Sequence, residues 1–225
     1  MSVERRVSNG LHAGIGYTLS RVKDNASSLT DILPNSYDDS AYYGISDLDR
    51  THVLIANWIY ELPFGRGTAS ALNRALGHWE ITGVYQYQTG SPFSVRSNDD
   101  FAGVGPGSGS QFWNLIGDPT ITRGAFESTA AWFNSAAFAR PAAGTFGVQP
   151  RNLLRNPPTW NLDFGLRKSV PIKNAQRIEF RVEAFNVLNH PNWDNAGSNP
   201  TMGSFGFVTS KVGSRVVQLA TKYMF

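Results

Sequence analysis

One short segment shows the clearest pattern of side chains that could carry acid–base or ion-binding chemistry. Arg177, Glu179, Arg181 and Glu183 alternate strictly with apolar residues over 177–184. Two carboxylates beside two guanidinium groups could serve general acid–base catalysis or bind a charged substrate. A period of two, however, places all four on one face of a β-strand. We therefore interpret them as a polar strand face that pairs its charges with neighbouring strands.

Other familiar catalytic arrangements are missing from the sequence. The chain has no cysteine, which excludes disulfides, thiolate metal sites and a cysteine nucleophile. Its sequence contains neither a phosphate-binding Gly-Lys-Ser/Thr loop nor a G-x-S-x-G element. The histidines do not show the spacing of a zinc site; they are His12, His52, His78 and His190. We expect no enzymatic activity, no catalytic residue, no metal and no cofactor.

The elements that would position these residues are six segments in which apolar and polar residues alternate. Each is roughly ten residues long, which exceeds the usual length of soluble strands and suits a tilted strand that crosses a bilayer. The sequence thus predicts an all-β fold of antiparallel, up-and-down transmembrane β-barrel strands. The segments lie near 8–23, 50–62, 79–95, 159–170, 176–188 and 215–225. The residues expected to face the lumen are Asp163, Arg167, Arg177, Glu179, Arg181 and Glu183.

The connections between these segments alternate between long and short. The long ones span 24–49, 96–158 and 190–214, and in an up-and-down arrangement all three lie at the same end. Outer-membrane barrels have this asymmetry, with long external loops and short periplasmic turns. The longest loop is rich in aromatic residues, which either pack against one another or form a ligand-capture surface. The candidate ligand-binding residues are Trp113, Trp132, Phe133 and Phe138.

Composition narrows the class of protein. The chain has 225 residues, 16% charged and 12% aromatic, and a formal net charge of +3. Lysine and arginine are scattered singly, so we expect no nucleic-acid partner. No stretch reaches the 18 or so apolar residues of a membrane-spanning helix, and no apolar signal region follows the N-terminal arginines.

Several motifs resemble a known family. The ending 217–225 is similar to the C-terminal signature of outer-membrane barrel proteins, with Phe225, Tyr223 and Leu219 at its alternate positions and Thr221 as a departure. The run Glu-Ala-Phe-Asn-Val-Leu-Asn-His-Pro at 183–191 is the most specific of the others. Over essentially its whole length the chain resembles the late barrel of TonB-dependent outer-membrane receptors, in their Oar-like branch.

This resemblance implies a 22-stranded barrel in the outer membrane, an N-terminal plug, a signal peptide and energy from TonB. We expect the chain to supply about the last six strands of such a barrel, without the plug and signal peptide. The expected partners are outer-membrane lipid, the barrel-insertion machinery that reads Leu219, Tyr223 and Phe225, and TonB only through the plug. The expected function is that of a barrel wall with external loops for uptake of a substrate that the sequence does not name.

Two other architectures compete with this one. A soluble, secreted β-sandwich that binds carbohydrate explains the alternation and the aromatic loop. It explains neither the terminal Phe225 nor the long loops at one end. A small closed barrel of adhesin or enzyme type needs at least eight strands, whereas the sequence predicts six.

Overall fold

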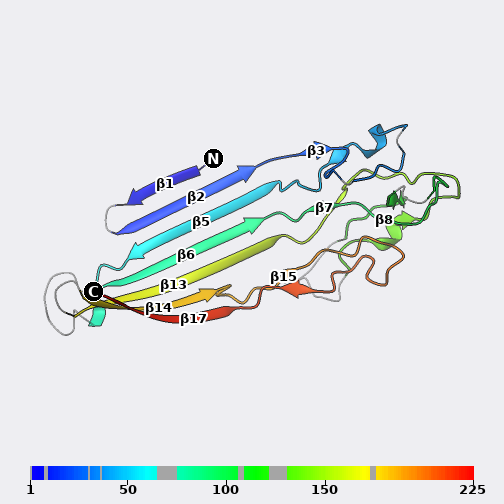
Figure 1. The fold of residues 1–225 in the computed structure, drawn as a ribbon. Coiled ribbons are helices and arrows are strands. Elements are labelled where there is room, and N and C mark those ends of the chain that lie inside the picture. Colours follow the sequence, from blue (N-terminus) through cyan, green and yellow to red (C-terminus); the bar gives the residue numbers. More distant parts are fainter. Residues whose placement is uncertain are drawn as a thin grey trace.

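One antiparallel sheet dominates the structure, a computed structural model. The structure describes residues 2–7, 10–29, 31–35, 37–64, 75–105, 109–121, 131–172 and 176–225. The sheet has seven strands in the order β1-β2-β5-β6-β13-β14-β17, each beside its neighbour in Figure 1. The strands are β1 (Ser2–Val7), β2 (Leu11–Leu19), β5 (His52–Glu61), β6 (Trp79–Gln88), β13 (Thr159–Pro171), β14 (Arg177–Phe185) and β17 (Val216–Met224).

The sheet contains one strand more than the six that the alternation predicts. The additional strand is β1, whose sequence Ser-Val-Glu-Arg-Arg-Val has three charges in a row and so breaks the period of two. The structure nevertheless has a strand here, because β1 pairs antiparallel with β2. The pairing runs from Ser2 opposite Gly16 to Val7 opposite Leu11. The expected first strand, 8–23, corresponds to β2, and residues 8 and 9 lie outside the described residues.

The register of the sheet fits large side chains against small ones. Trp58 of β5 lies directly opposite Gly83 of β6. The indole of Trp58 covers the space where a Cβ of residue 83 would stand. Glycine at 83 therefore permits the close approach of this ring, which a larger residue would obstruct.

At one end of the sheet the long loops form a compact loop body (Figure 1), which we define as the described residues of 20–51, 89–158 and 186–215. The strand expected over 79–95 leaves the sheet after Gln88, and its continuation forms one of five short pairs. These are β3 (Lys23–Asp24) with β4 (Gly44–Ile45), β7 (Pro92–Phe93) with β12 (Leu154–Arg155), β8 (Arg96–Ser97) with β9 (Gln111–Phe112), β10 (Asn114–Leu115) with β11 (Phe138–Ala139), and β15 (Asn192–Trp193) with β16 (Lys211–Val212).

Helical structure is slight in the described residues. The loop body contains two 3₁₀ turns, η1 (Ser40–Tyr42) and η2 (Ser135–Ala137). In η2 the side chain of Asn134 caps the turn by accepting the N–H of Ala136. No helix in the described ranges is long and apolar enough to span a membrane.

The hydrophobic core lies in the loop body and not beneath the sheet. Residues from the second and third long loops meet there: Val95, Trp132, Phe133, Ala137, Phe138, Ala196 and Val208. The main sheet, by contrast, has no second sheet packed on it among the described residues, and its strands contact chiefly one another. This arrangement differs from a β-sandwich, in which two sheets enclose the core.

Candidate functional surfaces

A chain of ion pairs crosses the polar face of the sheet. Arg167 of β13 lies opposite both Glu80 of β6 and Arg181 of β14, and it forms an ion pair with Glu80. Glu179, which is only 3% exposed, accepts from Arg167 at 3.4 Å and pairs with Arg181 as well. One buried carboxylate therefore separates two guanidinium groups that stand directly across from each other.

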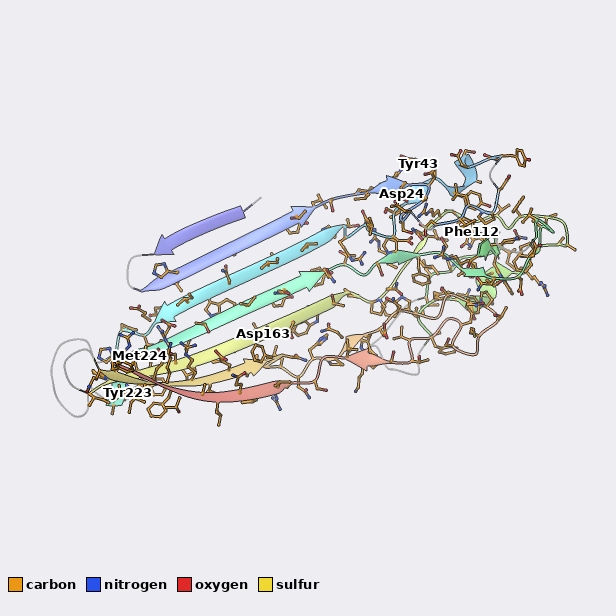
Figure 2. All side chains as sticks on the ribbon, viewed as in Figure 1. Asp24, Tyr43, Phe112, Asp163, Tyr223 and Met224 are labelled. Carbon is orange, nitrogen blue, oxygen red and sulfur yellow. The ribbon has the colours of Figure 1, made fainter. Side chains whose placement is uncertain are left out.

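The other charged residues expected in the lumen share this face. Asp163 lies mid-sheet (Figure 2) and accepts the backbone N–H of Asn186 at 2.8 Å. Glu183 stands opposite Gly165 and forms no ion pair within the described residues. Arg177 lies at the far end, with its guanidinium 3.4 Å from the sulfur of Met224. The alternation therefore predicted correctly which residues lie together on one face.

The opposite face of the sheet is apolar and exposed. Its side chains include Ile15 on β2, Phe180 and Val182 on β14, and Leu219 on β17, which is 75% exposed. Monomeric soluble proteins rarely leave an apolar surface of this extent uncovered. Tyr223 of the terminal segment is exposed at the end far from the loop body (Figure 2). Phe225 is exposed too, with its ring centroid 6.1 Å from that of Tyr223.

One charged residue on the apolar face has hydrogen-bond partners close to it in space. Lys168 of β13 lies opposite Trp79. Its Nζ donates to the carbonyl oxygens of Ala75, at 3.0 Å, and Gly77, and it stands 5.2 Å from the centroid of the Trp79 ring. A lysine with a long stem and a carbonyl-bound head suits the rim of an apolar band. Sequence reasoning missed this contact, because the two carbonyls come from a turn about 90 residues earlier.

Two arginines join the first long loop to the second. Arg155 pairs with the fully buried Asp49 at 2.6 Å and also donates to the carbonyl of Gly90 at 3.1 Å. Arg151 pairs with Asp24 at 3.1 Å and donates to the hydroxyl of Ser27 at 2.7 Å. The segment 151–155 thus holds two loops together.

Acid is expected to weaken the Asp49–Arg155 contact. Burial raises the pKa of the Asp49 carboxyl, but hydrogen bonds from Arg155, the Val22 N–H and Thr51 outweigh this, so its pKa lies below 3.8. A lowered folded-state pKa contributes stability that is present above the unfolded value and is lost as the pH falls through the folded value. We expect the loop body to become protease-sensitive below about pH 4, the usual carboxyl range, and Asp49→Asn to be sensitive already at pH 7.

Limited proteolysis of intact cells at pH 7 and at pH 3.5 measures this. Asp194→Asn is the matched control, because Asp194 is exposed and accepts from Ser210 and Asn195 on the surface. Equal resistance of Asp49→Asn and the unchanged protein at pH 7 would contradict the proposed contribution of this ion pair.

The four aromatic candidates for ligand capture lie in the interior of the loop body. Trp132, Phe133 and Phe138 are buried in its hydrophobic core, and Trp113 packs against that core. The indole N–H of Trp132 donates to the carbonyl of Arg155 at 2.6 Å, and that of Trp113 to the hydroxyl of Ser97 at 3.0 Å. Packing of the loop by its own side chains accounts for this burial, and their role in ligand binding stays a prediction.

Asn186 organises the turn that leaves β14. Its φ of 51° is left-handed, a conformation that asparagine tolerates better than most residues. Its side chain donates to the carbonyls of His190, at 2.8 Å, and Gly213, and accepts the N–H of His190 at 2.9 Å. The His190 ring lies 3.8 Å from that of Trp160, and burial lowers the pKa of His190. The turn thus fixes the entry to the third long loop.

Comparison with known families decides between the architectures. A family model described as an outer membrane beta barrel domain matches residues 1–218. The chain belongs to the outer-membrane β-barrel domain family. The comparison with curated proteins found no match, and the comparison with solved structures found none either.

Membership of the outer-membrane β-barrel family explains why one face of the sheet is apolar and the other polar. An outer-membrane barrel domain is located in the outer membrane and crosses it with antiparallel strands, which have one apolar and one polar face. The soluble, secreted β-sandwich alternative is wrong, because the seven-stranded sheet has no second sheet packed on it in the described residues and the chain matches a membrane family. Within the described residues, no group of three or more acidic and histidine side chains is placed to hold a metal ion.

Proposed function

We propose that this barrel domain forms part of the wall and the external loops of a TonB-dependent receptor of the Oar-like branch, which takes up a substrate across the outer membrane. The observation that carries the proposal is the combination of an ordered loop body at one end with a charged, paired face along the sheet beneath it. A lumen wall needs polar residues on one side, and a receptor needs structured loops outside.

The edges of the sheet support a larger barrel. β1 and β17 lie at the two ends of the strand order, so each has one side without a partner strand in the described residues. Unpaired backbone groups are costly in lipid, and closure of the barrel removes them. We propose that further strands complete the wall and that the insertion machinery reads Leu219, Tyr223 and Phe225, which lie exposed on edge strand β17 and just after it.

Retention on TonB tests the proposal. Outer membranes of the native host are solubilised in detergent and passed over the immobilised periplasmic domain of TonB, and an antibody to the external loop 96–158 detects the protein. We expect a retained band several times larger than 24.7 kDa, the mass of this chain, that shifts on boiling. A band near 24.7 kDa that TonB does not retain would contradict a receptor. We also propose that the chain is not an enzyme.

A further inference from the structure

The polar face of the sheet contains an uncharged cavity next to the loop body. Its volume is about 240 Å³, and β5, β6 and β13 form its floor. Two rows of cross-strand partners make up that floor: Val53, Gln88 and Thr159, then Ile55, Gln86 and Asn161. Asn192 closes one side and accepts the backbone N–H of Trp160 at 2.9 Å. Strands rather than loops thus hold the residues that would contact a ligand.

The cavity differs in charge from the wall further along the same face. None of the residues that line it is charged. A second, smaller cavity nearer the other end of the sheet is lined by Glu80, Arg167, Arg181 and Glu183. A charged ligand in the first cavity would lose water without gaining a charged partner, which is costly. The first cavity therefore favours an uncharged ligand.

Carboxamides supply its hydrogen-bonding side. Gln86 and Gln88 are exposed, and within the described residues their side chains form no hydrogen bond. Each carboxamide offers two N–H donors and a carbonyl acceptor. A peptide group offers one donor and one acceptor and so complements a carboxamide.

Aliphatic side chains supply the other side. Val53, Ile55 and Ile59 of β5 lie on the polar face, and Ile55 and Ile59 are 47% and 46% exposed. The residue across from Ile55 on β2 is Gly16, where a Cβ would meet nothing within 4 Å. Glycine therefore leaves this aliphatic strip of Val53, Ile55 and Ile59 uncovered, on the same face of the sheet as the ion pairs.

The spacing of these residues matches an extended peptide. Alternate residues of a strand lie about 6.6 Å apart, both along β5 and along any extended peptide that lies beside it. Such a peptide places alternate side chains on Val53 and Ile55 and its backbone near Gln86 and Gln88. A carbohydrate gains most from stacking on aromatic rings. Tyr87 and Trp160 also line the cavity, but they are out of phase with the two rows of the floor, so the alternation directs their rings to the opposite face of the sheet.

We propose that this cavity binds an uncharged oligopeptide with aliphatic side chains, in an extended conformation. The proposal rests on the proposed function, whose substrate class it names. The ligand would meet the cavity at the loop-body end of the polar face, before the charged part of the wall.

Calorimetric titration of the protein, purified from outer membranes in detergent, tests the proposal. The probe is a tetrapeptide of alternating valine and glycine, acetylated and amidated so that it carries no charge. The double variant Gln86→Glu with Gln88→Glu is expected to weaken binding about tenfold or more, because it puts unpaired charge beside an apolar ligand. Gln218→Glu, on the same face of β17 but outside the cavity, is expected to bind as the unchanged protein does.

A second variant and a second probe test the peptide assignment independently of the double variant. Ile55→Thr preserves the β-branched shape and is expected to weaken peptide binding several-fold, so it serves if the double variant fails to show a heat-shifted, folded band. Maltotetraose, an uncharged glycan, binding in place of the peptide would overturn the peptide assignment, and binding of neither probe would overturn the cavity as a ligand site. TonB retention is measured separately, so failure of the receptor proposal is distinguishable from failure of this one.

Discussion

Phe133→Ala is expected to destabilise the loop body by about 3–5 kcal/mol, the usual cost of removing a fully buried phenylalanine. Phe133 is 2% exposed, and its ring centroid lies 5.4 Å from that of Phe205, 5.7 Å from Phe138 and 5.8 Å from Phe93. Loss of the ring leaves a cavity among three aromatic neighbours. Protease digestion of intact cells should cleave the loops of the variant, while the heat-shifted band of the folded barrel persists.

Tyr43→Ala is the control for this substitution. Tyr43 belongs to the same loop body but is largely exposed (Figure 2), so its removal should change stability by no more than about 1 kcal/mol. Loops of Phe133→Ala that resist protease as well as the unchanged protein, together with loss of ligand uptake, would show a binding role in place of a packing role.

Glu179→Ala is expected to cost the barrel about 2–4 kcal/mol. Removal of one member of a buried ion pair leaves the other charge uncompensated. Here Arg181 loses its ion pair, whereas Arg167 keeps the one with Glu80. The two arginines are direct cross-strand partners and would repel each other without the carboxylate between them. Both arginines are about 40% exposed (39% and 41%), which places the effect at the lower end of the range for buried pairs. Urea unfolding of the protein in lipid vesicles, followed by tryptophan fluorescence, measures it.

Glu183→Ala is the matched control, on the same strand and the same face. Glu183 forms no ion pair in the described part of the chain, so its loss should change the unfolding free energy by less than about 0.5 kcal/mol, as for most surface substitutions. Equal stability of the two variants would show that Glu179 does not hold the two arginines together.

The sequence was sufficient to predict which side chains of a strand share a face, and that the long loops lie at the same end of the sheet. In 177–184 the strict alternation places Glu179, Arg181 and Glu183 on one side, and the structure has them there. A period of two is a local property of the extended backbone, so a single strand displays it without any neighbour. Loop lengths are equally local, and they predicted one end for 24–49, 96–158 and 190–214, whose described residues lie at one end of the sheet (Figure 1).

Where two faces of a strand are similar, the alternation is less informative. β5 has Leu54, Ala56 and Trp58 on one face but Val53 and Ile55 on the other. The sequence therefore indicated an apolar face without showing that the second face also contains an aliphatic strip. In β1 the alternation fails altogether, because three consecutive charged residues interrupt it. Only the pairing with β2 shows that this segment is a strand.

Tertiary structure alone decided the register, the ion pairs and the loop core. Arg167 meets Glu80 across 87 positions of sequence, and Arg155 meets Asp49 across 106. Val95 and Phe133 lie 38 positions apart in the second long loop, and Val208 lies in the third; they meet only when the strands hold the loop ends together. The sequence by itself determined which way each side chain of a strand points, since that depends on the local backbone. Which side chains meet depends on how distant strands align, and that is fixed by the fold as a whole.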